Sequence, residues 1–352
     1  MSKTRWPLLP LLALVTSCGG GTAGGSDATA AVTVVTAPAP AAVATPAPSP
    51  VTPTPTPTPA VAVGADFAAR AAALYISPPS IAGCQPGQLS PAVTAALLAS
   101  LNNIRALHKL PPVTYSSNDE AAAQAAALLQ AANDTLSHSP PTSWKCFTTL
   151  GATGSGASDL YGGFGNGLAV ASDDDILAGW LIETNNLVAD SVGHRRWLLD
   201  PFLGSVAYGR VIGASPTQTR GDAAALKVFN NADSGTIGGT LPAYVAYPFG
   251  DYPARYFNTG ALLSFGVVAS SDPNSAANAQ VVYANAVVTI RPRGGATLAV
   301  SKQSYDNQGY GLPNNLQFAV AGLQAGTYYD VTITGVVVNG AAQTYSYAFR
   351  IV

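Results

Sequence analysis

The chain has 352 residues, of which 48% are hydrophobic and only 10% are charged, and its formal net charge is −2. These values predict an ordinary folded core with room for two domains and tails. No run of Lys or Arg is longer than the pair Arg195 and Arg196, so the charge pattern excludes an extended phosphate-binding surface for nucleic acids. The composition leaves the choice between an enzyme and a binding module open.

Residues 1–18 have the pattern of an export signal. Lys3 and Arg5 precede an apolar run from Leu8 to Val15, which is shorter than the roughly 20 residues that span a bilayer. Small residues then precede Cys18, and this ending resembles a bacterial lipobox. It predicts that Cys18 carries a lipid that inserts in the bilayer. The alternative is a plain cleaved signal in which this cysteine is incidental.

The predicted location follows from the residue after Cys18, which is a glycine and not the aspartate that marks retention in the inner membrane. In a Gram-negative cell this favours an exported lipoprotein of the outer membrane or cell surface, with a periplasm-facing position as the alternative. Residues 19–65 are rich in Pro, Thr and Ala, with a Thr-Pro repeat at 52–59. Because proline fixes φ and lacks an N–H, we expect a disordered, extended tether.

Two cysteines remain in the exported part, Cys84 and Cys146. An oxidising compartment would pair them, so we predict a disulfide that closes a loop of about 60 residues. A metal site that uses both thiols is the alternative, but no C-x-x-C or neighbouring histidine pair favours it.

The first half of the main region predicts two helices. Ser90 and Pro91 are typical N-cap and N1 residues, and apolar residues follow at helical spacing as far as Leu107. Ser116 or Ser117 is expected to cap a second, alanine-rich helix that runs through residue 133.

A glycine-rich segment, residues 150–168, is predicted to be a folded-over loop, because its glycines do not fit the G-x-G-x-x-G pattern of a phosphate cradle. A third helix is expected after Ser172, with three aspartates in its first turn and an apolar side that includes Trp180 and Leu187. Strands are predicted at 206–212 and 224–229. This order predicts an α+β domain over residues 66–232 with an α-β-α sandwich arrangement.

From residue 233 to 352 the pattern changes to short strands, predicted at 281–290, 316–320 and 331–338. Asn339-Gly340 is typical of a tight hairpin turn. The run that ends in Tyr328 and Tyr329 resembles the tyrosine corner of immunoglobulin-like and fibronectin type III sandwiches, with Tyr329 as the corner residue or Tyr328 by one slip. We therefore expect an all-β, immunoglobulin-like sandwich that offers at most a partner surface.

Four short motifs occur in order: Asn103 with Arg105, Leu136 to Ser139, Trp180 to Glu183, and Gly193 to Trp197. This series resembles the CAP superfamily, also called the SCP or PR-1-like domain or the cysteine-rich secretory protein family. The resemblance extends over about half of the chain. It implies a cleft lined by two histidines and two acidic residues, which holds a divalent metal in some members.

Carried over by motif, His138 matches the first histidine of the family, Glu183 the acid that follows the helix tryptophan, and His194 the second histidine. Ser158 stands where the family commonly has a glutamate, and Asp159 stands at the asparagine that follows it. Three interpretations of this set remain open. The histidines are buried structural residues, or they hold zinc together with Glu183, or they bind another ligand.

The functional prediction is a binding module that captures a small apolar ligand, such as a lipid or sterol, or a cell-surface partner in the cleft that His138 and His194 line. The alternative is a metal-dependent, peptidase-like hydrolase in which Glu183 acts as base on a water held by the two histidines. The catalytic roles of Glu183 and His194 rest on this alternative.

Two further expectations concern charged side chains near the motifs. Arg195 and Arg196 are expected to clamp Glu183, Asp190 or Asp200 by bidentate hydrogen bonds, with Arg195 also a binding candidate. His108 is expected to be a solvated charge that complements the dipole of the first helix.

Overall fold

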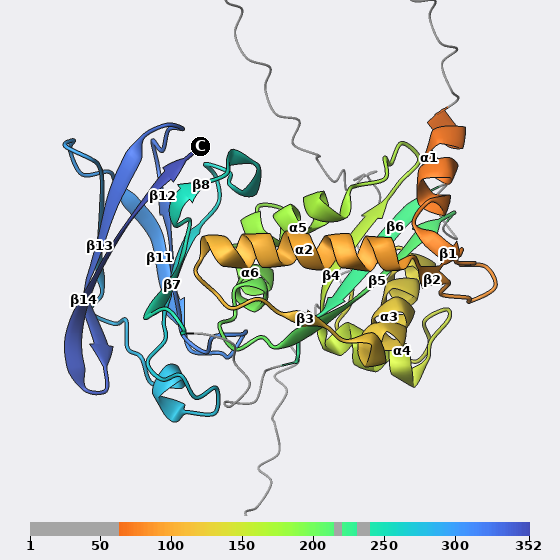
Figure 1. Cartoon of the computed structure of the whole chain (residues 1–352), viewed down its shortest axis with the longest axis horizontal. Coiled ribbons are helices and arrows are strands. Elements are labelled where there is room, and N and C mark those ends of the chain that lie inside the picture. Colours follow the sequence, from red (N-terminus) through yellow and green to blue (C-terminus); the bar gives the residue numbers. More distant parts are fainter. Residues whose placement is uncertain (1–62, 215–219, 231–239) are drawn as a thin grey trace, which may run out of the picture. The chain divides into compact units, whose positions relative to one another are not determined.

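The computed structural model describes residues 63–214, 220–230 and 240–352 (Figure 1). The predicted signal, Cys18 and the tether as far as residue 62 lie outside the described residues. Among those described, no helix is both long and apolar enough to cross a membrane. The first helix, α1, begins at Val63, which lies inside the predicted tether of residues 19–65.

The N-terminal region is built on a four-stranded sheet with the order β3-β5-β6-β4. β5 pairs antiparallel with β6 and parallel with β3, and β6 pairs antiparallel with β4. The strands are β3 Thr114–Tyr115, β4 Ser158–Phe164, β5 Ser205–Gly213 and β6 Gly221–Lys227. A small two-stranded sheet joins β1 Tyr75–Ser77 to β2 Gln88–Leu89.

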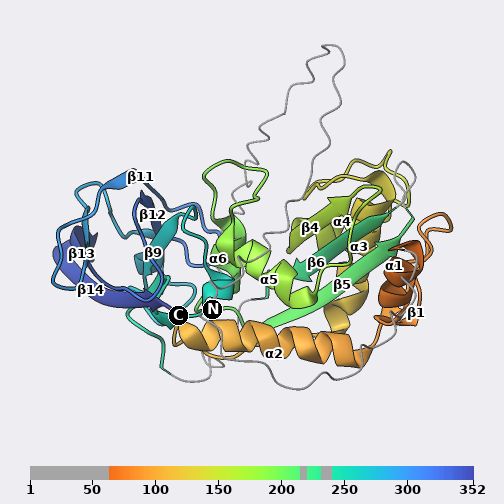
Figure 2. The ribbon, with the colours of Figure 1, turned by 90° about the horizontal axis from the view of Figure 1, so that it is seen from above.

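Helices cover both faces of this sheet (Figure 2). Alanines of α3 form one core with Val211 and Ala223, while apolar residues of α2 and α5 form another with Tyr208 and Leu226 on the opposite face. The helices are α1 Val63–Ala72, α2 Pro91–Leu107, α3 Glu120–Asn133, α4 Thr149–Gly156, α5 Asp173–Ile182 and α6 Gly193–Leu198. Mixed helices and sheets confirm the predicted α+β class.

The predicted loop at 150–168 is wrong, because this segment forms all of α4 except its first residue and then β4. Its glycines serve close packing. A Cβ at Gly154 would lie 2.2 Å from the carbonyl oxygen of Ala122, so only glycine lets α4 approach α3 this closely. β4 then runs along the edge of the sheet beside β6.

Two helix ends also differ from the prediction. A 3-10 turn, η1 Ser117–Asp119, precedes α3, and neither Ser116 nor Ser117 caps that helix. The Ser116 hydroxyl donates instead to the Asp119 carboxylate over 2.6 Å. α5 begins after Ser172 as predicted, and Ser172 and Asp175 form a capping box there, but the helix ends at Ile182, and Leu187 is 81% exposed and lies beyond it.

The C-terminal region contains two four-stranded sheets, with the orders β10-β13-β14-β8 and β11-β12-β9-β7. Phe265 of the second sheet stacks on Tyr347 of the first, with ring centroids 6.3 Å apart, so the two sheets share a core. The strands are β7 Tyr244–Tyr247, β8 Gly250–Tyr252, β9 Leu263–Val267, β10 Val287–Pro292, β11 Val300–Asp306, β12 Asn315–Val320, β13 Tyr328–Val338 and β14 Ala341–Ile351. Two 3-10 turns are η2 Ala254–Tyr256 and η3 Ala276–Ala279.

The hairpin prediction is confirmed, because Asn339 and Gly340 have φ of 50° and 79° between β13 and β14. Tyr329 is buried, and its hydroxyl accepts a hydrogen bond from the backbone N–H of Gln324 over 2.7 Å, whereas Tyr328 is 37% exposed. The predicted strand at 281–290 begins only at Val287. The immunoglobulin-like assignment and the boundary at residue 233 stay predictions.

The predicted disulfide between Cys84 and Cys146 is confirmed, with a Cα to Cα distance of 5.1 Å. It joins the segment before α2 to the segment between α3 and α4. The two cysteines are 62 residues apart in sequence, so the bond restricts a long loop in the unfolded chain.

Replacing both cysteines with alanine is expected to lower the free energy of unfolding by about 4 kcal/mol, the loop-entropy value for this separation. Denaturant unfolding of the oxidised protein and the double variant measures this difference. The reduced wild-type protein is the matched control and should behave like the variant. Equal stability of all three forms would contradict the expectation.

Candidate functional site

Glu183 lies at the end of α5 and joins this helix to α6. Its backbone is left-handed (φ 66°), a conformation that costs energy for a residue with a side chain. The turn directs its carboxylate to the start of α6, where Oε1 accepts from the backbone N–H of Arg195 over 3.0 Å. The carboxylate thus satisfies one of the N–H groups that the first turn of a helix leaves unpaired.

The second oxygen of Glu183 holds His194. Oε2 lies 2.9 Å from Nδ1 of His194 and accepts a further hydrogen bond from the Asn186 side chain over 2.7 Å. Both carboxylate oxygens are therefore engaged, and Nε2 of His194 is the ring nitrogen left for a ligand. Asn186 was not predicted, although its position three residues after Glu183 suits a local turn contact.

Burial on its own would lower the pKa of His194, but the hydrogen bond that its Nδ1 donates to Glu183, together with the charges of Asp159 and Glu183, raises it to about 9. His194 is therefore protonated at neutral pH. Its side chain keeps 21% of its surface exposed, compared with 3% for that of Glu183. A charged imidazole consequently faces solvent while its partner carboxylate is buried.

The second carboxylate of the site comes from Asp159 on β4. Burial raises the pKa of Asp159 well above its ordinary value, with the charge of His194 acting in the opposite direction and that of Glu183 adding to the rise. Its Oδ2 has no hydrogen-bond partner within the described segments. Ser158 points elsewhere, because its hydroxyl donates to the Gly154 carbonyl over 2.7 Å.

His138 completes the group. Its Nδ1 lies 3.0 Å from the carbonyl oxygen of Ser155, and because a carbonyl only accepts, Nδ1 carries the proton and Nε2 has the lone pair. Burial lowers the pKa of His138, the Ser155 carbonyl opposes this, and the charge of His194 lowers it further. The site thus contains one neutral and one protonated histidine within electrostatic reach of each other.

The predicted zinc ligands do not form a ready-made site. Within residues 63–214, 220–230 and 240–352, no group of three His, Cys, Asp or Glu side chains is arranged to hold a metal ion. Both carboxylate oxygens of Glu183 already accept hydrogen bonds, from Asn186, His194 and the backbone of α6. A metal at this site would have to displace those hydrogen bonds.

The expected clamps by Arg195 and Arg196 are wrong. The Arg195 guanidinium donates to the carbonyl oxygens of residues 181, 182 and 262, and stacks 3.8 Å above the ring of Tyr247. Arg196 binds both carboxylate oxygens of Asp306, over 2.8 and 3.0 Å. Only the backbone of Arg195 contacts Glu183.

The expectation for His108 is also wrong. Its ring is 3% exposed and makes hydrogen bonds to the Ala246 carbonyl over 2.8 Å and to the Tyr252 hydroxyl over 3.0 Å. Burial lowers its pKa to about 3, so it is neutral and carries no charge for the helix dipole. Both partners follow more than 130 residues later in sequence, which no local pattern reports.

The family comparison bears on the segment that contains all four site residues. Residues 98–218 match the family model described as the cysteine-rich secretory protein family, CAP. This segment is a CAP domain. Comparison with curated proteins finds no relative of the chain. The CAP domain supplies His138, Asp159, Glu183 and His194, whereas the β-rich C-terminal region lies outside the match.

Replacing Glu183 with glutamine keeps the shape of the side chain and removes its charge. The pKa of His194 should then fall by roughly one to three pH units. In the wild type the His194 pKa is higher in the folded than in the unfolded state. The pair of His194 and Glu183 therefore stabilises the fold fully below about pH 6.5, and this stabilisation is lost as the pH rises through about 9. An NMR titration of the histidine rings measures the change.

The matched control is Glu120→Gln, which alters the other glutamate of the chain, at the start of α3. This variant should leave the titration of His194 as in the wild type. A His194 pKa that is the same in both variants would show that Glu183 does not set it.

Proposed function

We propose that the chain is an exported, lipid-anchored protein whose CAP domain binds a ligand at the site of His138, Asp159, Glu183 and His194. One observation carries this choice over hydrolysis. Both oxygens of Glu183 are committed to holding His194, Asn186 and α6, so Glu183 is an orienting group and not a free base. What the site offers to a second molecule is the two Nε2 atoms.

The charges favour a ligand with an acidic or hydrogen-bond-accepting head. His194 is protonated, and the buried Arg195 guanidinium acts on the Glu183 carboxylate through its charge, without a hydrogen bond between them. An acceptor that met Nε2 of His194 would make a charge-assisted hydrogen bond.

The surroundings also supply apolar surface. Leu187 and Val188 are 81% and 65% exposed, and both lie in the segment that connects Glu183 to His194. Exposed apolar side chains next to a binding group often mark a contact with a partner or ligand. The ligand that fits both features is an amphiphile, such as a fatty acid, within the predicted class of small apolar ligands.

The test is calorimetric titration of the purified protein with decanoate and, separately, with decanol, which lacks the acidic head. We expect decanoate to bind more tightly than decanol. His194→Gln should weaken decanoate binding about tenfold or more, because a charge-assisted hydrogen bond contributes roughly 1.5–3 kcal/mol. Glu120→Gln is the control and should leave binding unchanged.

Two results would overturn the proposal. Equal affinity for decanoate and decanol, unaffected by His194→Gln, would remove the role of the imidazolium. One equivalent of zinc that binds tightly to the wild type but not to His194→Ala would favour the hydrolase alternative, in which Glu183 exchanges its present partners for a metal-bound water.

Anchoring is proposed on the sequence features of residues 1–18 and of the proline-rich tether. Replacing Cys18 with alanine removes the lipid acceptor, and the protein should move from the membrane to the soluble fraction of lysed cells. Immunoblotting of the two fractions measures this. Unchanged membrane association of the variant would show that another surface, such as an apolar patch, causes the binding.

A further inference from the structure

We propose that the C-terminal β region is a working part of the His194 site, because it sets the position of α6 through Arg195 and Arg196. The sequence assigned this region no chemistry beyond packing and a partner surface. The structure instead connects three of its strands, β9, β11 and β12, and the turn that leads into β12, to the residues that flank His194. The inference does not depend on which ligand the site binds.

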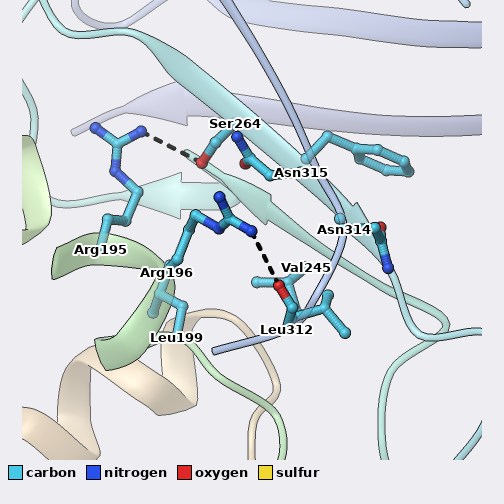
Figure 3. Close-up of a pocket in the computed structure, with 10 residues that line it drawn as sticks. Arg195, Arg196, Leu199, Val245, Ser264, Leu312, Asn314 and Asn315 are labelled. Carbon is cyan, nitrogen blue, oxygen red and sulfur yellow. Dashed lines mark hydrogen bonds between the residues drawn. The ribbon is translucent and has the colours of Figure 1, made fainter. Parts of the chain in front are cut away.

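Arg195 makes the first connection. It follows His194 in the chain, and its guanidinium links the end of α5 to the start of β9, through Leu262 O at 2.7 Å and the Ser264 hydroxyl at 3.3 Å (Figure 3). Arg195 is 1% exposed. Its side-chain hydrogen bonds all go to carbonyl or hydroxyl oxygens, so a buried cation depends on these partners.

Arg196 makes the second connection. Its guanidinium binds Asp306 at the end of β11 and the carbonyl oxygen of Tyr310 in the following turn. It also donates to the Leu312 carbonyl (Figure 3). This turn packs directly on α6, because a Cβ at Gly311 would lie 2.4 Å from the carbonyl oxygen of Arg196. Gly311 also has a φ of +60°, and both facts require glycine at this position.

A third connection holds the segment between Glu183 and His194. The carboxylate of Asp190 pairs with Lys302 of β11 over 2.8 Å, and the carbonyl of Asp190 accepts from Gln317 of β12. The Lys302 pair is exposed and contributes little by itself. Together with the two arginines, however, it places contacts from the C-terminal region on both sides of His194 along the chain.

The space behind the two arginines is closely filled. Arg195, Arg196, Ser264 and Asn314 line a pocket of about 30 Å³ (Figure 3). A volume of this size holds a water molecule or two, whereas pockets for organic ligands measure roughly 300–1,000 Å³. The pocket therefore belongs to the packing of α6 on the β strands and is not a second ligand site.

The geometry of α6 explains why such support matters. The helix has only six residues, and a helix this short has no stability of its own. His194, Arg195 and Arg196 lie in consecutive positions, so the contacts of the two guanidinium groups restrain the backbone that carries the imidazole. Arg195 and Arg196 are thus positioning residues for His194, and Ser264 and Asp306 act through them.

The experiment uses the full chain and two single variants outside the CAP domain, Ser264→Ala and Asp306→Asn. The ¹⁵N and ¹H resonances of the histidine rings report the hydrogen bond between His194 and Glu183. We expect both variants to shift the His194 ring signals relative to the wild type. Ser264→Thr, which keeps the hydroxyl, should leave the His194 ring signals at their wild-type positions. A ligand is not needed, so failure of the binding proposal would leave this result unaffected.

The matched control is Asp330→Asn, which breaks an exposed pair with Arg293 on the same C-terminal region but contacts no part of α6. It should leave the His194 signals unchanged. Wild-type signals in both Ser264→Ala and Asp306→Asn would overturn the proposal, even if the melting temperature fell. Should Ser264→Ala fail to fold, Asp306→Asn decides alone, since Asp306 is partly exposed and its loss is tolerable.

Discussion

The site depends on one buried carboxylate that serves three donors. Glu183 accepts from the α6 backbone, from His194 and from Asn186, and its position at the end of α5 requires a left-handed backbone. Removing a carboxylate from water is costly unless hydrogen bonds replace the lost hydration. The three donors supply that replacement, and the same contacts fix the start of α6. The residue that ends α5 is therefore also the residue that orients His194.

The charges around Glu183 explain why the C-terminal region matters to it. The charges of His194 and Arg195 both act on the Glu183 carboxylate, and burial raises the pKa of Asp159. Arg195 consequently relies on carbonyl and hydroxyl dipoles, several of which come from the loop before β9 and from β9 itself. The local electrostatics of the CAP domain are completed by atoms that lie outside the matched segment 98–218.

Local sequence patterns predicted the features that depend on residues close in sequence, namely helices and a hairpin turn. Helical spacing located α2, an alanine-rich run located α3, Ser172 followed by three aspartates located the start of α5, and Asn339-Gly340 located a hairpin. The ordered motifs selected a histidine and a glutamate, and these two side chains form a hydrogen bond. The failures have two causes. Glycines that allow close packing were interpreted as loop formers at 150–168, and partners distant in sequence were missed.

Distant partners were missed for His108, Arg195 and Arg196, whose contacts lie 67 to 144 residues away. From the sequence alone, a charged or polar residue at a helix end is expected to be exposed to solvent. Only the structure shows which distant element buries it. Each of these side chains is covered by the C-terminal β region, so the sequence of the CAP domain alone carries no signal for them. The same argument explains why bidentate clamps were assigned to nearby aspartates that the arginines do not contact.

Ser158 and Asp159 show a further limit of matching by position. Successive side chains in a strand point to opposite faces of the sheet, so neighbouring residues of β4 reach different environments. Ser158 bonds to α4 on one side, while Asp159 feels the charges of Glu183 and His194 on the other. The absence of a glutamate at Ser158 therefore does not leave the site with one acid. A second carboxyl group is present, buried on the face of β4 that meets Glu183 and His194, and its charge helps to raise the pKa of His194.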